Sequence, residues 1–180
     1  MPRTSALTPP EFLASLLETY AVSDRMNQII IDRLDPRVWR AKPPGRSVRT
    51  IAAIFSHMHH ARRKWLRLSA PHIKLPAELE PRRCTPQQVK RSLAQSAKLC
   101  SKMLADALSG AGRITHFQRD GWSRRWPSGA SMFAYMIMHD VHHRGQICML
   151  AHQLGYPIKG GHEIWMWEKL WKQCGFAGPH

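Results

Sequence analysis

The segment that decides the fold is "ASMFAYMIMHDVHHRGQICMLAHQL", residues 130–154. Apolar residues recur in it every three or four positions, and a glycine and a proline follow closely, so we expect a helix that ends there. At about 100° per residue, the apolar stripe of this helix takes in His139 and His143, whereas His142 lies about 60° away from it. The pattern therefore predicts a helix that directs two imidazoles toward the protein interior.

Three further segments show the same periodicity, and loops rich in proline and glycine separate them. We expect these helices at about residues 8–34, 48–68 and 87–108, with Thr8, Ser47 and Thr85 as their N-caps. Connections of short to medium length favour antiparallel neighbours. The predicted fold class is all-α, an antiparallel four-helix bundle with an additional short C-terminal helix at about 162–174. We treat residues 1–180 as one domain with a core at about 8–155.

Composition keeps a second class of function open. The chain has 180 residues and a formal net charge of +15, from 27 Lys and Arg against 12 Asp and Glu. Such an excess favours contact with polyanions, but the charges are dispersed, and we find no RNA-binding aromatic signature or zinc-finger spacing. The densest basic groups are "ARRKWLR" (61–67), "PRRC" (81–84) and "SRRW" (123–126). A basic helical module that binds nucleic acid or another polyanion, without catalysis, remains the alternative.

The N-terminal sequence, the lack of long apolar runs and the spacing of the cysteines favour a cytoplasmic protein. The N-terminal residues lack the apolar core of a signal peptide, and no run approaches 18 apolar residues, so we expect no membrane span. The four cysteines form no CxxC pair, which favours reduced thiols. Cys148 lies about 180° from His139 on its helix, so the cysteines are poor candidates for metal ligands.

The histidines can be explained by a metal ion or by hydrogen bonds alone. A buried imidazole without a partner is costly, and two imidazoles one turn apart can share one ion, or each can bond to a neighbouring helix. A third ligand would come from the second helix, where His57 lies at the edge of the apolar arc. His60 lies about 60° further out and His59 nearly opposite the arc. His57 is therefore the best third candidate.

Several residues around this pair allow more than one role, and no catalytic residue is assigned. Gln146 is either an orienter of a histidine or a polar residue at a helix crossing. Asp140 and Arg144 are expected on the other flank of the helix, with Arg144 structural or at the surface. Gly145 is expected to allow close helix approach. Glu163 can approach the histidines from the last segment. The tryptophans of that segment either pack onto the bundle, form a dimer surface or line a ligand site; they are Trp165, Trp167 and Trp171.

One histidine in the second helix followed by HxxxH in the fourth, here His57, His139 and His143, resembles the DinB-like family, also called the DinB/YfiT-like metalloenzymes. "HHRGQI", residues 142–147, looks like the HRGQ signature of that family. The resemblance covers residues 8–155. It implies a four-helix bundle, often dimeric, in which three histidines hold a divalent metal such as nickel or zinc. Relatives with known activities include thiol-dependent transferases and a thiol-dependent maleylpyruvate isomerase.

A three-histidine site has chemical consequences of its own. Three neutral nitrogen donors leave positions open for water or substrate, as in catalytic sites, and they do not select among zinc, nickel, copper and iron. Such a site, together with what the resemblance implies, leads us to expect a cytoplasmic metal-binding protein that acts as a metal-dependent hydrolase or thiol-dependent transferase. The homodimer and the transfer of a thiol to a small electrophile are implied by the resemblance alone.

Overall fold

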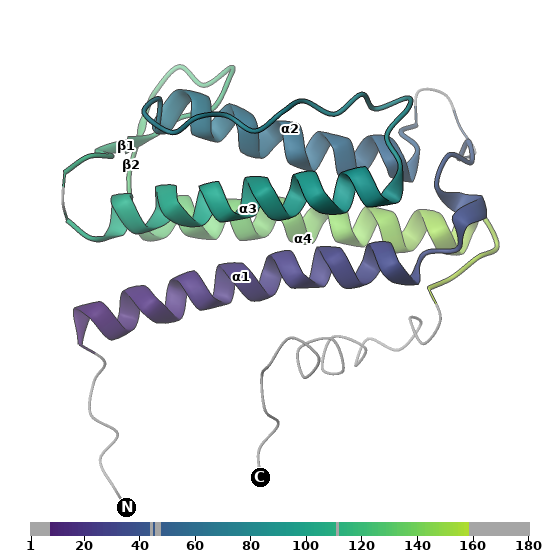
Figure 1. Cartoon of the computed structure of the whole chain (residues 1–180), viewed down its shortest axis with the longest axis horizontal. Helices are drawn as coiled ribbons and strands as arrows, with labels where there is room; N and C mark the ends of the chain where they lie inside the picture. Colours follow the sequence, from purple (N-terminus) through teal and green to yellow (C-terminus); the bar gives the residue numbers. More distant parts are fainter. Residues whose placement is uncertain (1–7, 44, 46–47, 111, 159–180) are drawn as a thin grey trace, which may run out of the picture.

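The computed structural model describes residues 8–43, 45, 48–110 and 112–158, and within them the chain is mostly helical. The elements in chain order are α1 (Pro9–Arg33), the 3₁₀ helix η1 (Pro36–Val38), α2 (Ile51–Ser69), α3 (Pro86–Leu108), β1 (His116–Phe117), β2 (Trp126–Pro127) and α4 (Ala130–Gln153). Four long helices and one two-stranded sheet agree with the predicted all-α class. Figure 1 shows the four helices lying lengthwise beside one another.

Helix starts follow the capping residues in the sequence. The Thr8 N–H donates to Glu11 Oε2 at 2.7 Å, and Thr85 caps α3 with its hydroxyl. The second helix begins later than we predicted. Thr50 has an extended backbone, and its hydroxyl accepts a hydrogen bond from a backbone N–H three residues on, so α2 starts at the next residue. Ser47, the expected cap, lies outside the described residues.

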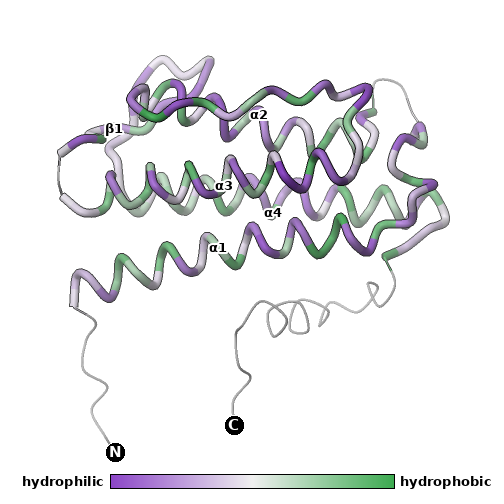
Figure 2. Tube along the Cα trace, in the orientation of Figure 1, coloured by the Kyte–Doolittle hydropathy of each residue, from purple (hydrophilic) through white to green (hydrophobic). Residues whose placement is uncertain are grey.

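The interior contains two apolar clusters with a polar layer between them. Helices α1 and α2 each contact both α3 and α4, and apolar and polar stretches alternate along all four helices (Figure 2). On α4, Met136 belongs to one cluster and Ile147 to the other. The buried residues between these two positions are polar, and they include Asp140 and His143. The functional candidates therefore lie at mid-height of the molecule.

The connection between α3 and α4 covers one end of the structure. Its strands β1 and β2 pair antiparallel, with Phe117 opposite Trp126, and they lie beside the end of α2 (Figure 1). Phe117 is fully buried, and its ring lies 6.0 Å from the ring of Trp122.

A second connection, residues 70–85, runs along the outer side of α2 (Figure 1). His59 was expected on the face opposite the apolar arc, but it is fully buried, because this segment covers it. Its Nε2 lies 2.8 Å from the Ala77 carbonyl oxygen. Helical periodicity could not reveal this, since it describes one helix and not the loop that packs on it.

The described helices include none that is both long and apolar enough to cross a membrane. The predicted C-terminal helix, with Glu163 and the three tryptophans at 165, 167 and 171, lies outside the described residues.

Candidate metal centre

The three predicted histidines come together between α2 and α4. Each offers one ring nitrogen, and these nitrogens all lie within 4.8 Å of one another. The ring centroids are 4.5 Å apart for His139 and His143, 4.8 Å for His57 and His143, and 5.5 Å for His57 and His139. One helical turn separates the two histidines of α4, and the packing of α2 against α4 supplies the third. This group could hold a metal ion.

His142 lies outside this group, as its helical position predicted. Its side chain is exposed, and its ring centroid is 5.0 Å from that of His143. It belongs to the wall of the adjoining cavity and not to the cluster of three nitrogens. His142 is therefore a natural control for the other three.

Neighbouring side chains orient two of the imidazoles. His143 Nδ1 lies 2.8 Å from Gln146 Oε1, so Nδ1 donates the hydrogen bond and Nε2 keeps its lone pair. His139 Nδ1 lies 3.7 Å from Asp140 Oδ1, and both of these buried atoms lack a hydrogen-bond partner. A carboxylate at this position favours a proton on His139 Nδ1, so Nε2 again keeps the lone pair with which it can bind a metal ion. Gln146 is thus the orienter that one of its two sequence interpretations proposed.

Burial keeps two of the imidazoles neutral. Loss of hydration lowers the pKa of His57 to about 4, and positive charge on Arg49 and on the neighbouring imidazoles lowers it in the same direction. Burial likewise lowers the pKa of His143 to about 4, against the opposing effect of the Gln146 hydrogen bond. A metal ligand must be a neutral imidazole, so these residues fit a divalent ion at pH 7 without first losing a proton.

A buried ionic network supports the histidine cluster from behind. Arg62, fully buried on α2, donates to Asp24 Oδ1 of α1 at 2.8 Å and to Asp140 Oδ2 of α4 at 2.6 Å. It also donates to the Leu93 carbonyl of α3 at 3.0 Å, so one guanidinium joins all four helices. Burial alone would raise the pKa of Asp140, but the charge of Arg62 reverses this and holds it below its usual range.

Arg144 extends the same network and corrects one expectation. Its Nη1 donates to the backbone oxygen and the hydroxyl of Ser23 and to Asn27 Oδ1, each at 3.0 Å. Arg144 is therefore structural, as expected, but it is buried and not at the surface, and Asp140 is buried too. The interior face of α4 is wider than we predicted: His139 and His143 face α2, Arg144 faces α1, and Asp140 bonds to residues of both helices.

Gly145 does not mediate close helix approach, so that expectation is wrong. It lies on the exposed side of α4, and a Cβ added there would meet no atom within 4 Å.

A cavity of about 590 Å³ opens directly over the three histidines. Trp65 and Tyr135 form aromatic walls, with their ring centroids 5.9 Å apart, and the Trp65 ring lies 5.1 Å from that of His139. Charged side chains stand around the opening; they are Arg63, Lys64, Glu78, Arg119 and Asp120. A cavity of this size suits a small molecule.

The densest basic group in the sequence, residues 61–67, is largely neutralised by acidic neighbours. Arg62 is buried in the network, and Arg63 lies 2.5 Å from a Glu78 oxygen. Lys64 and Arg67 lie 3.1 Å and 2.8 Å from the two carboxylate oxygens of Asp120. This segment therefore offers a polyanion less free positive charge than its sequence indicates.

The cysteines agree with their expected role outside the site. Cys84, Cys100 and Cys148 are free thiols, and none belongs to the group of three potential ligands. Cys100 is fully buried, and loss of hydration raises the pKa of its thiol to about 12. Cys174 lies outside the described residues.

Sequence reasoning did not find the supporting residues. The contact of Arg62 with Asp24 and Asp140, and that of Arg119 with Tyr135, join residues far apart in the chain. A signal for the first was present, because Arg62 follows the apolar Met58 by four residues and so lies on the same helical face, where a charge needs a partner.

The sequence profile described as "DinB family" matches residues 4–166. No curated protein and no solved structure is significantly similar to the chain.

Proposed function

The chain belongs to the DinB family, and on this premise we propose that it binds one divalent metal ion through His57, His139 and His143 within an antiparallel four-helix bundle. The observation that carries the proposal is the convergence of three imidazole nitrogens within 4.8 Å on the floor of an open cavity. Nickel and zinc are the ions we propose first, because the resemblance to the DinB-like family implies them and imidazole ligands suit both.

Such a site supports catalysis more than structure. Structural zinc sites have four protein ligands, whereas three ligands beside an open cavity leave room for a reacting molecule. A bound divalent ion would supply Lewis acidity, which favours hydrolysis or the transfer of a thiol to a small electrophile. We propose a metal-dependent hydrolase or thiol-dependent transferase of this kind, with His57, His139 and His143 as ligands.

The residues of the chain itself have separable roles in this proposal. In this proposal, the Gln146 amide oxygen and the Asp140 carboxylate favour a proton on Nδ1 of His143 and His139, which leaves the Nε2 atom of each ring free to bind the metal ion. Trp65 and Tyr135 give the cavity an aromatic wall beside the histidines. We further propose that the protein works in the cytoplasm as a homodimer, which sedimentation equilibrium of the full chain would test.

Metal content decides the central proposal. Untagged protein that has never met a nickel resin should retain close to one divalent ion per chain after dialysis. His57→Ala, His139→Ala and His143→Ala should each lose it, whereas the control His142→Ala should keep it. If His142→Ala loses the ion while His139→Ala keeps it, the assignment is wrong.

A duplex-binding assay on the same preparations separates the polyanion alternative. Weak binding that falls steeply with salt would reflect the net charge alone. Tight, sequence-selective binding at physiological salt by a metal-free protein would favour the alternative.

A further inference from the structure

Charged residues at the mouth of the cavity are paired, with one exception. Arg63 is paired with Glu78, and Lys64 with Asp120. Within the described part of the chain, Arg119 forms no ion pair. The cavity therefore has one cation that no carboxylate of its own wall neutralises.

Aromatic side chains hold this arginine in place. An Arg119 N–H donates to the Tyr135 hydroxyl at 2.5 Å. The guanidinium carbon lies 5.7 Å from the ring centroid of Trp122 and 5.9 Å from that of Tyr135. A guanidinium has five N–H donors, and the Tyr135 hydroxyl accepts from one of them. The others remain available at a position fixed by two rings, which lowers the entropic cost of binding an anion.

The position of Arg119 relative to the histidines limits the ligand. Tyr135 precedes His139 by one helical turn, which corresponds to about 6 Å along α4. The Trp65 ring lies beside both Tyr135 and His139, at 5.9 Å and 5.1 Å between centroids. A molecule that reaches from Arg119 to the histidines therefore crosses a flat, apolar wall.

We propose that Arg119, held by Tyr135, is an anion subsite, and that the cavity takes a small carboxylate with a flat or apolar body. Its carboxylate bonds to the Arg119 guanidinium, and its other end faces the three histidines. Any reaction of the ligand at the three histidines rests on the proposed function, whereas the recognition of its carboxylate by Arg119 needs no metal ion.

Benzoate and its neutral analogue benzamide are matched probes for this subsite. Both would be titrated into the full chain, metal-free and zinc-loaded, while the Arg119 side-chain N–H and Trp122 indole N–H resonances are followed by NMR. Metal-free wild-type protein should bind benzoate about fivefold more tightly than benzamide. This ratio corresponds to about 1 kcal/mol, the upper end of the range for an exposed ion pair. Arg119→Gln should remove this preference and leave benzamide binding unchanged.

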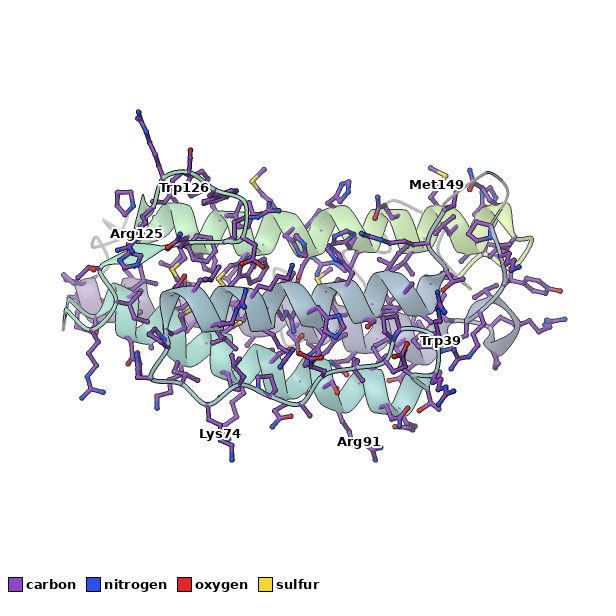
Figure 3. All side chains as sticks on the ribbon, turned by 90° about the horizontal axis from the view of Figure 1, so that it is seen from above. Trp39, Lys74, Arg91, Arg125, Trp126 and Met149 are labelled. Carbon is purple, nitrogen blue, oxygen red and sulfur yellow. The ribbon has the colours of Figure 1, made fainter. Side chains whose placement is uncertain are left out.

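Two further variants control for net charge and for positioning. Arg91→Gln also removes one positive charge, from the far side of α3 (Figure 3), and it should keep the benzoate preference. Tyr135→Phe keeps the ring and the guanidinium but removes the bond between them, so the preference should fall only partly. Unfolding midpoints would confirm that all variants fold.

Failure of this inference is distinguishable from failure of the proposed function. A protein that retains metal through its histidines but shows no benzoate preference, or keeps the preference in Arg119→Gln, overturns the anion subsite alone. A protein that retains no metal but loses the preference in Arg119→Gln supports the subsite and overturns the metal site. Loss of the preference in Arg91→Gln would assign it to net charge and overturn the subsite.

Discussion

Asp140 should affect stability and metal binding by two separate routes, and Asp140→Asn tests both. One carboxylate oxygen, Oδ2, accepts from Arg62 at 2.6 Å and from Asn27 at 3.1 Å, while the other, Oδ1, faces His139 Nδ1 at 3.7 Å. Removing one partner of a buried ion pair costs about 3–5 kcal/mol. Because Asn keeps an acceptor and Arg62 keeps Asp24, we expect the lower end, about 3 kcal/mol.

The second route concerns the proton on the imidazole. An amide N–H in place of Oδ1 would favour a lone pair on His139 Nδ1 and a proton on Nε2, the nitrogen proposed to bind metal. Loss of such an orienting partner lowers metal affinity by about 10–100-fold. Urea unfolding of the metal-free protein would measure the first effect, and competition for zinc with a chromophoric chelator would measure the second.

Asp24→Asn is the matched control, because it also removes a carboxylate from Arg62 but is not a neighbour of His139. It should destabilise the protein by a similar amount and leave zinc affinity close to that of the wild type. The reasoning is refuted if Asp140→Asn unfolds with an unchanged free energy. Equal loss of zinc affinity in the two variants would show that His139 is not oriented by Asp140.

Three further predictions concern single side chains. Gln146→Ala should lower zinc affinity about tenfold by freeing the His143 ring, with little change in the urea midpoint, and an unchanged affinity would contradict the role of this hydrogen bond. In metal-free protein, the imidazole NMR signals of His57 and His143 should titrate near pH 4. Because the pKa of both groups is lowered in the folded state, their contribution to stability is lost as the pH falls from about 6.5 to 4. Titration midpoints near 6.5 would show that burial does not lower these pKa values. Gly145→Ala should stabilise the protein by about 0.5–1 kcal/mol, because the site is open and helical, whereas destabilisation would reveal a neighbour on that face.

Helical periodicity predicted the four long helices and the convergence of three histidines between two of them. The extent of α4, and the placement of His139 and His143 on one stripe with His142 outside it, follow from the spacing of apolar residues at about 100° per residue. His57 followed from its position at the edge of the apolar arc of α2. These are properties of single helices, and a sequence contains them directly.

Contacts between helices and loops were not predictable in the same way. Arg144 and Asp140 are buried because α4 has two neighbouring helices, so its interior face is wider than its apolar stripe. His59 is buried because a loop covers it, and Arg119 reaches the cavity through a hairpin whose strands are two residues long. In each case, a polar residue is buried or positioned by a partner distant in sequence, which periodicity does not describe.

The ligand set is the central claim, and X-ray absorption at the zinc edge of zinc-loaded, full-length protein tests it most directly. We predict three imidazole nitrogens at about 2.0–2.1 Å, with any remaining ligands being oxygen or nitrogen. His142→Ala should leave the spectrum unchanged, whereas His139→Ala should retain too little zinc after dialysis to give a comparable spectrum. A sulfur ligand at about 2.3 Å, or fewer than three imidazoles in the wild-type protein, would contradict the account.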